Sequence, residues 1–329
     1  MSTPCVRAPL ESGEATRQAL AEHDLLDGDR EIAVEDGDIY VPVVDADAAR
    51  DAGYDVVDRV TAERDGPTPP AEILGFEPTY ERLGDVVIID EDDPDRAREI
   101  ADAIVESDVP CETVVNRASK VSGEFRVREW DVLYGDDTET VHREYGHEFA
   151  LDIAEVYFSP RLATERHRVT EQVNDGERVV DMFAGVGPFA IPMAARGGDV
   201  LACDVNPAAI RYLRENAERN GVAERITLLE GDVRETTADY DGWADRVVMN
   251  LPHSADDFLD TAVRLASDDC VLHLYDIQHE DDPFGPGERA IREAAEPAGY
   301  EVEVLTRHEV RSYAPHELNV CLDVRIHRS

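Results

Sequence analysis

Lysine is almost absent from this sequence: Lys120 is the only one, and every other basic side chain apart from histidine is an arginine. The 32 lysines and arginines face 74 aspartates and glutamates, so the formal net charge is −42. Acidic residues occur along the whole chain. Such a surface stays hydrated in molar salt, where the Debye length falls to about 3 Å and repulsion between carboxylates is screened. The composition therefore predicts a halophilic source. The alternative is that the acidity repels nucleic acid or attracts a basic partner, and net charge does not exclude an RNA substrate.

Long apolar runs and paired cysteines are also missing. No stretch approaches the roughly 18 apolar residues of a membrane span, and the first residues, Met1 to Arg7, show no basic segment followed by an apolar one. We therefore expect no membrane partner and a cytoplasmic location. The five cysteines are odd in number and form no Cys-x-x-Cys pair, which predicts neither a disulfide framework nor a zinc site. We expect no metal.

Segments rich in proline and glycine, together with the hydrophobic pattern, divide the chain into domains. We predict a small N-terminal domain at 1–65, a proline-rich linker at 66–75 and a middle α+β domain at 76–155. From 156 to 329, strand-like and helix-like segments alternate, which predicts an α/β fold with a parallel, Rossmann-like sheet. The last two β-rich runs, 301–305 and 319–326, leave no room for a long helical crossover. We therefore expect them to pair antiparallel at the sheet edge.

A glycine-rich turn follows the first strand of this last region. Gly185 and Gly187 remove side chains where the strand becomes a helix, which lets a ligand lie against the backbone. Asp204 ends the next strand, where it can accept from ribose hydroxyls, and Asp232 ends the third, where it can accept from an adenine amino group. Asp181, at the turn, favours a cation over a pyrophosphate. Together these features describe S-adenosylmethionine, although a glycine-rich loop can also do no more than turn the chain.

The segment Asn250-Leu-Pro-His follows the fourth strand. An asparagine beside a transferable methyl group can hydrogen-bond the edge of a nucleobase, and Pro252 keeps the turn rigid. Methyltransferases that act on adenine N6 carry Asn/Asp-Pro-Pro-aromatic here, and this sequence lacks the second proline and the aromatic residue. Asn250 can also be a simple strand-end cap. We count Asn250, Phe183 and Val205 among the cofactor contacts.

Several motifs together resemble the archaeal tRNA (guanine-37-N1) methyltransferase family, over nearly the whole chain. They are Tyr157-Phe-Ser-Pro-Arg161-Leu-Ala-Thr-Glu165-Arg, Val180-Asp-Met-Phe-Ala-Gly-Val-Gly-Pro-Phe189, Asp204-Val-Asn-Pro, Gly231-Asp-Val-Arg-Glu, Met249-Asn-Leu-Pro252 and Ser312-Tyr-Ala-Pro315. The resemblance implies a class I methyltransferase domain at the C-terminus, preceded by two smaller α+β domains. It also implies a tRNA partner, bound at its anticodon loop and its elbow. We expect a monomer.

The resemblance assigns Glu165 as the general base that takes the proton from guanine N1, and burial would raise the basicity of such a carboxylate. It implies that a middle-domain arginine stabilises the charge on guanine O6, for which we choose Arg128, with Arg126 as the fallback. It places Tyr157 against the flipped base. Two alternatives stay open: Glu165 as a surface acid paired with Arg161 or Arg168, and Tyr157 as ordinary core packing.

Two further arginines complete the predicted substrate contacts. Arg161 belongs to the most specific motif, and Arg143 lies in His142-Arg-Glu-Tyr-Gly, which we interpret mainly as a structural turn with Arg143 as a phosphate contact. The closest rival function is the related aminocarboxypropyl transfer of wybutosine synthesis. Other rivals are another S-adenosylmethionine-dependent RNA methyltransferase, a noncatalytic RNA-binding protein that keeps the cofactor pocket, and a small-molecule methyltransferase.

Overall fold

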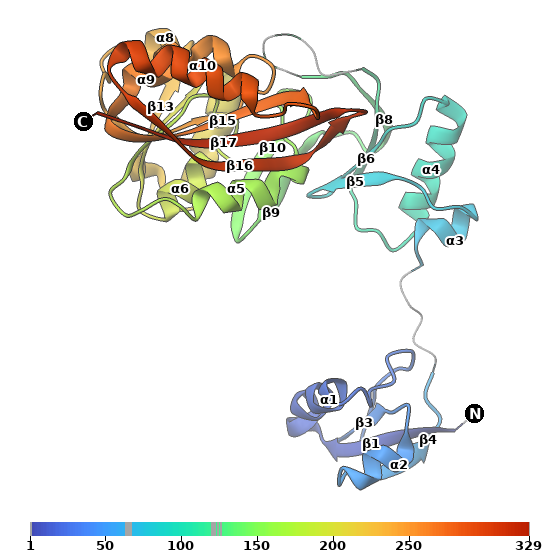
Figure 1. The fold of residues 1–329 in the computed structure, drawn as a ribbon. Coiled ribbons are helices and arrows are strands. Elements are labelled where there is room, and N and C mark those ends of the chain that lie inside the picture. Colours follow the sequence, from blue (N-terminus) through green and yellow to red (C-terminus); the bar gives the residue numbers. More distant parts are fainter. Residues whose placement is uncertain (1, 63–67, 120–122, 124, 126, 329) are drawn as a thin grey trace. The chain divides into compact units, whose positions relative to one another are not determined.

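The computed structural model describes residues 2–62, 68–119, 123, 125 and 127–328, and Figure 1 shows its elements. The chain divides into two compact units: residues 1–78 with 103–109, and residues 79–102 with 110–329. Among the described residues, no helix has the length and apolar character needed to cross a lipid bilayer.

The first unit is built on a small antiparallel sheet with the strand order β2-β3-β1-β4. Its elements are β1 (Thr3–Pro9), η1 (Leu10–Ser12), α1 (Gly13–Glu22), β2 (Ala33–Glu35), β3 (Asp38–Pro42), α2 (Ala46–Asp51), β4 (Val56–Arg59) and α3 (Pro70–Leu74). Val6, Leu20 and Val41 are buried in one core cluster, so the sheet and α1 share a core. Part of the predicted linker, 66–75, therefore forms the short helix α3.

The second unit begins with a four-stranded sheet of order β5-β6-β7-β8 and a separate hairpin. The elements are β5 (Tyr80–Leu83), β6 (Val86–Ile89), α4 (Pro94–Glu106, whose last turn belongs to the first unit), β7 (Thr113–Arg117), β8 (Trp130–Tyr134), β9 (Glu139–Glu144) and β10 (His147–Asp152). The β9–β10 turn has Tyr145 at φ +44° and Gly146 at φ +87°, a conformation typical of tight hairpins. The turn predicted at this segment is confirmed.

The rest of the second unit is a seven-stranded sheet with the order β13-β12-β11-β14-β15-β17-β16. Its elements are η2 (Pro160–Leu162), α5 (Ala163–Thr170), β11 (Arg178–Asp181), α6 (Ala190–Ala195), β12 (Asp199–Asp204), α7 (Pro207–Arg219), η3 (Ala223–Arg225), β13 (Ile226–Glu230), α8 (Val233–Thr236), β14 (Ala244–Met249), η4 (Ala255–Phe258), α9 (Leu259–Leu265), β15 (Ala266–His279), α10 (Gly285–Ala295), η5 (Glu296–Ala298), β16 (Glu301–Ala314) and β17 (Glu317–His327). The strands from β13 to β15 are parallel, and β17 runs antiparallel to both of its neighbours. The predicted Rossmann-like fold and the antiparallel pair at the edge are confirmed.

Helices cover both faces of this sheet, with α5 and α6 on one side and α9 and α10 on the other (Figure 1). One core cluster joins α6 and α7 to the sheet and extends to Leu83 and Val115 of the four-stranded sheet. The other joins α9 and α10 to the opposite face. The strand order reverses at β11, so the carboxyl ends of β11, β12 and β14 border a crevice, the usual ligand site of such sheets.

Candidate active site

A cavity of about 210 Å³ lies at the carboxyl ends of these strands. Its lining residues come from the ends of β11, β12, β13 and β14 and from the loops after them. They are Phe125, Tyr157, Met182, Phe183, Gly185, Asp204, Val205, Asn206, Ala209, Gly231, Asp232, Val233, Arg234, Asn250, Leu251 and Phe258. The structure thus brings together six of the predicted cofactor contacts: Phe183, Gly185, Asp204, Val205, Asp232 and Asn250.

The two glycines of the β11–α6 turn have different structural roles. Gly185 lines the cavity at φ +54°, and a Cβ built there meets no described atom within 4 Å, which leaves room for a ligand against the backbone. Gly187, at φ +93°, lies outside the lining, and a Cβ there would stand 2.2 Å from Cδ1 of Leu213. The missing side chain of Gly187 permits close packing of the turn against α7, and its role as a cofactor contact stays a prediction.

Asp204 binds two backbone amides at the rim of the cavity. Its carboxylate accepts hydrogen bonds from the backbone amides of Gly185, at 2.7 Å, and of Asn206, at 2.9 Å. Burial raises the pKa of Asp204, and these amides and that of Val205 oppose the rise. The carboxylate is therefore fixed at the end of β12, and its remaining lone pairs are available to hydroxyl donors.

Asp232 begins α8 and accepts from the amide of Arg234 as an N-cap. The guanidinium of Arg234 also binds this carboxylate, with Nε at 2.9 and 3.0 Å from its two oxygens, and lies 4.7 Å above the ring of Phe258. The predicted adenine contact at Asp232 thus shares its carboxylate with Arg234. Arg234 and Phe258 line the cavity and were missed by the sequence analysis, because no spacing rule links Phe258 to the glycine turn.

Asp181 is the last residue of β11 and is not among the residues that line the cavity. Its side chain is fully buried, and in the described part of the chain neither carboxylate oxygen has a hydrogen-bond partner. Burial raises its pKa to about 7, the Asp204 carboxylate adds to the rise, and the amides of Phe183 and Ala190 oppose it. Because these amides do not complete a hydrogen bond to the carboxylate, the buried acid is costly, and a nearby cation would be stabilising here.

Asn250 is positioned by the end of β14 and lines the cavity. Its Oδ1 is buried and accepts no hydrogen bond from any described residue. A ligand donor at this rim of the cavity would satisfy it. Pro252, two residues on, is not among the lining residues. His253 follows with φ +83°, which marks a sharp turn after the strand.

Glu165 is held by four contacts inside the fold. Its side chain is 4% exposed, and its carboxylate accepts from Nε and Nη2 of Arg168, at 2.7 and 2.8 Å, and from the hydroxyl of Tyr275, at 2.8 Å. His308 lies 3.2 Å away and is 38% exposed. The alternative prediction was that Glu165 is a surface acid paired with Arg161 or Arg168; the pairing with Arg168 is observed, but the side chain is buried rather than on the surface.

This carboxylate belongs to a longer chain of buried groups. Arg168 also donates to Asp323, at 2.6 Å, and Asp323 lies 2.7 Å from Nδ1 of His273. The His273 and Arg168 partners hold the pKa of Asp323 well below its usual range, against the effect of burial. The network keeps Arg168, and through it Glu165, in one orientation.

The three side chains His273, Cys321 and Asp323 place potential metal-ligating atoms within 4.8 Å of one another. However, Nη1 of Arg246 lies 2.6 Å from His273 Nε2, and Arg168 already occupies Asp323. Two guanidinium groups at this distance repel a divalent cation. We therefore interpret the group as part of the buried polar network.

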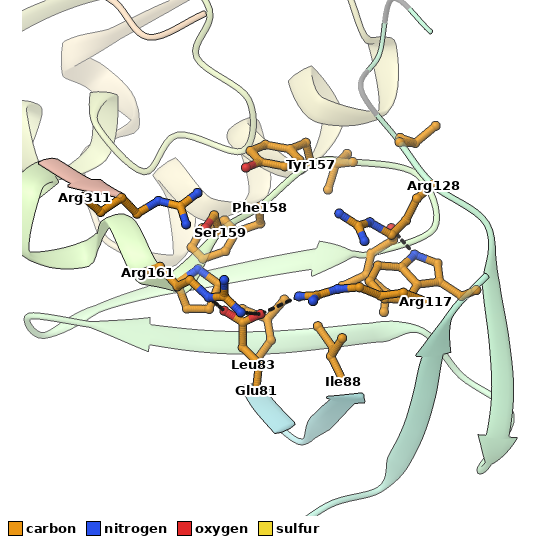
Figure 2. A pocket seen from close by; sticks show the side chains of 15 residues that line it. Glu81, Leu83, Ile88, Arg117, Arg128, Tyr157, Phe158, Ser159, Arg161 and Arg311 are labelled. Carbon is orange, nitrogen blue, oxygen red and sulfur yellow. Dashed lines mark hydrogen bonds and ion pairs between the residues drawn. The ribbon is translucent and has the colours of Figure 1, made fainter. Parts of the chain in front are cut away.

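A second cavity, of about 170 Å³, adjoins the first at Tyr157, which lines both. Figure 2 shows its side chains, among which Arg128, Arg161 and Tyr157 were predicted as substrate contacts or catalytic groups. Arg161 donates to Glu81, from Nε at 2.9 Å and Nη2 at 3.3 Å. Arg128 lies 5.3 Å from the centre of the Trp130 ring, and burial, followed by the nearby Arg117, lowers its pKa. Tyr157 is 42% exposed, so it is not a fully buried core residue.

The remaining two predicted arginines lie elsewhere. Arg126 falls outside the described residues. Arg143 is 72% exposed on β9 and pairs with Glu148, and it lines neither cavity. Arg117 and Arg311, which the sequence analysis did not single out, do line the second cavity.

Comparisons with known proteins give a consistent result. Three family models match: the TRM5/TYW2 methyltransferase domain at residues 140–304, the tRNA methyltransferase 5 N-terminal domain at 5–49 and the TYW2 N-terminal domain at 68–138. The tRNA (guanine(37)-N(1))-methyltransferase Trm5b of Pyrococcus abyssi is 40% identical over 336 residues, which cover 98% of this chain and 99% of that protein. The tRNA(Phe) (4-demethylwyosine(37)-C(7)) aminocarboxypropyltransferase of Methanocaldococcus jannaschii is 33% identical over 252 residues, 76% of this chain and 98% of that protein.

Solved structures agree with these matches. The complex of aTrm5 with tRNALeu superposes with a TM-score of 0.71 and 34% identity, covering 98% of this chain and 99% of that one. The Methanocaldococcus jannaschii Trm5 in complex with adenosine gives a TM-score of 0.67 and 32% identity, covering 99% of this chain and 100% of that one. The fold, the cavity and the matches along the chain lead to one conclusion: this protein belongs to the Trm5/TYW2 methyltransferase family.

Proposed function

We propose that this protein is a tRNA (guanine(37)-N(1))-methyltransferase, which transfers a methyl group from S-adenosylmethionine to N1 of guanosine 37. The observation that carries the proposal is the 40% identity to the Pyrococcus abyssi Trm5b over 98% of this chain. The match to the aminocarboxypropyltransferase stops at 76% of the chain. Residues 5–49 match the N-terminal domain model of tRNA methyltransferase 5.

The first cavity fits the cofactor chemically. Gly185 leaves open space against the backbone, Asp204 offers fixed acceptors, and Asn250 offers an unpaired one in the described part of the chain. The buried carboxylate of Asp181 favours a cation nearby. When bound, S-adenosylmethionine supplies an electrophilic methyl group on a sulfonium centre. Holding this group and the base in one orientation supplies much of the acceleration of such a displacement.

Glu165 acts as the general base. Guanine N1 carries a proton, and the nitrogen lone pair becomes available to the methyl carbon only as that proton moves to a carboxylate oxygen of Glu165. In the structure this carboxylate already accepts from Arg168 and Tyr275 and faces His308. His308 is more exposed than Arg168 or Tyr275, so we infer that the guanine reaches Glu165 from the His308 side.

The second cavity receives the target nucleotide. Tyr157 lines both cavities and provides an aromatic surface against which a flipped base can stack. Arg128, whose guanidinium is half-buried, stabilises the negative charge that develops on guanine O6 as N1 loses its proton. Pro252 keeps the Asn250 turn rigid, so that the side-chain amide of Asn250 stays at the cavity rim. Arg161 and Arg143 are proposed as further tRNA contacts.

The same proposal extends to the domains that bind tRNA, the oligomeric state and the cellular environment. The small N-terminal domain, 1–65, binds the tRNA elbow, the linker at 66–75 connects it to the middle domain at 76–155, and the catalytic domain at 156–329 binds the anticodon loop. The enzyme acts as a monomer in the cytoplasm, where its tRNA substrate is found. The net charge of −42 supports a halophilic source.

Nucleoside analysis tests this function. Unmodified tRNA transcripts with guanosine or adenosine at position 37 are incubated at molar salt with cofactor labelled either on the methyl group or on the aminocarboxypropyl group. We expect methyl label in 1-methylguanosine from the G37 transcript and none from the A37 transcript. Aminocarboxypropyl label in the tRNA would instead establish the wybutosine-type reaction.

A further inference from the structure

The second cavity concentrates positive charge in a strongly acidic protein. Arg117, Arg128, Arg161 and Arg311 line it, and Glu81 is the one carboxylate among its described lining residues. Figure 2 shows these side chains pointing into a common space from different elements: Arg117 from β7, Arg161 from η2 and Arg311 from β16. The lining itself therefore carries three more positive than negative charges, and one of these is compensated from outside it by Asp90, which pairs with Arg117.

Glu81 compensates only part of this charge. It binds Arg117, whose Nη2 lies 2.8 Å from Oε2, and it also binds Arg161. Both oxygens of Glu81 are thus occupied, and its side chain is 16% exposed. The two arginines around one carboxylate form a preorganised arrangement, and Asp90, outside the lining, provides a second carboxylate, 2.8 Å from Nη1 of Arg117.

Among the described residues, Arg311 and Arg128 have no carboxylate partner. Most arginines in the described part of the chain pair with an acid, but neither Arg311 nor Arg128 forms an ion pair there. The Nε of Arg311 is buried and has no hydrogen-bond partner among the described residues, and the same holds for the Nε of Arg117. Buried donors without acceptors are costly, so these two groups favour the binding of an acceptor, and the positive charge of the lining favours an anionic one.

The partner must be an anion that reaches the cavity together with an aromatic base. Tyr157 forms the boundary between the two cavities, so a base stacked there has its own backbone phosphates within about one nucleotide's length. Guanidinium forks match the oxygens of a phosphodiester. A carboxylate ligand would fit the charge equally well, but it would not explain why the cationic site adjoins the candidate base pocket.

We propose that Arg311, supported by the Arg117–Glu81–Arg161 cluster, binds a backbone phosphodiester of the substrate RNA immediately next to the target nucleotide. This inference rests on the proposed function, because it takes the second cavity as the place of that nucleotide. The contact positions the strand and does not read its sequence. Arg128 is left free to face the base.

The test combines a protein variant with a neutral phosphate. Equilibrium binding of full-length tRNA, at one fixed salt concentration, is measured for wild type and Arg311→Gln. The tRNA carries either natural linkages or a single methylphosphonate on the 5′ or the 3′ side of nucleotide 37. Arg214→Gln is the matched control, because Arg214 is an exposed arginine of α7 that forms no ion pair among the described residues and lines neither cavity.

We expect Arg311→Gln to bind natural tRNA about tenfold more weakly, roughly the effect of one charge-assisted hydrogen bond. One of the two methylphosphonates should weaken wild-type binding by a similar factor and should have no further effect on Arg311→Gln. In Arg214→Gln the same methylphosphonate should keep its full effect. Unchanged cofactor affinity and unfolding curves establish that Arg311→Gln is folded.

Two results would overturn the inference. The first is an unchanged tRNA affinity in Arg311→Gln. The second is that each methylphosphonate lowers the tRNA affinity of Arg311→Gln by the same factor as it lowers that of wild type. The proposed function is judged separately, by methylation of the natural G37 transcript with the wild-type enzyme. Because binding is measured without methyl transfer, the phosphate contact can fail while methylation succeeds, and the reverse.

Discussion

Replacing Asp181 with asparagine should stabilise the ligand-free enzyme while lowering its affinity for the cofactor. Asp181 is fully buried without a hydrogen-bond partner among the described residues, and burial raises its pKa from 3.8 to about 7. Because the folded pKa lies above the unfolded one, the native state holds this proton more tightly. The stability that this gives is fully present below pH 3.8 and is lost as the pH rises to about 7. At higher pH the folded protein carries a desolvated charge.

The size of the effect follows from the shift in pKa. A rise of about three pKa units at about 1.4 kcal/mol each corresponds to about 4 kcal/mol at pH 8. The same relation leaves a cost of about 2 kcal/mol at pH 5, where the carboxyl is mostly protonated in the folded protein. Asparagine has nearly the shape of the protonated acid and does not ionise. The advantage of Asp181→Asn should therefore grow by roughly 2.5 kcal/mol from pH 5 to pH 8.

Urea unfolding of wild type and Asp181→Asn at both pH values, at one fixed molar salt concentration, measures this difference. Calorimetric binding of S-adenosylmethionine supplies the functional arm. Wild-type affinity should increase as the pH rises through 7, because the ionised carboxylate stabilises the cation, and the variant should bind more weakly with a flat profile. A variant that is equally destabilised at pH 5 and pH 8 would refute the account of Asp181 as a buried ionisable group.

Other positions give independent tests. Glu165→Gln should reduce the single-turnover rate of methyl transfer at least about 100-fold with unchanged cofactor affinity, and a wild-type rate would exclude Glu165 as the base. Gly187→Ala should lower the free energy of unfolding by about 1–3 kcal/mol, because its Cβ would collide with Leu213 at positive φ; Gly185→Ala, with open space, should cost less stability but weaken cofactor binding, and equal unfolding curves would contradict this assignment. The affinity for tRNA should increase as salt is raised from low to molar concentration, and a flat or falling salt titration would contradict the proposed adaptation to salt.

Local sequence patterns were sufficient to predict the catalytic sheet. The glycine turn after β11 and the acidic residues at the ends of β12 and β13 identified the cavity, because parallel strands bring their carboxyl ends to one edge. The short connection before β17 excluded a parallel crossover and correctly predicted an antiparallel edge. The roles of individual residues within the cavity, and the domain boundaries, remain predictions.

The surroundings of Glu165 and the second cavity were not predictable in the same way. Arg168 lies three residues from Glu165 on one helix, so that pairing was foreseeable. Tyr275 and Asp323, however, come from strands more than 100 residues further along the chain. Arg311 likewise reaches its cavity only because β16 lies at the sheet edge. Only the tertiary fold determines such neighbours, and no local motif marks them.

The charge distribution explains why contacts between residues far apart in the sequence matter for tRNA binding. A net charge of −42 opposes the approach of a polyanion, and at low ionic strength this repulsion acts over tens of ångströms. Molar salt reduces its range to about 3 Å, which removes the repulsion but also removes long-range attraction by basic patches. Direct contacts between guanidinium groups and phosphate oxygens survive, because they act at hydrogen-bond distance and are partly desolvated. An acidic protein can therefore bind tRNA if arginines without an acidic partner, such as Arg128 and Arg311 here, lie in one cavity. That requirement explains why salt should strengthen binding here, whereas it weakens binding by a protein with a basic surface.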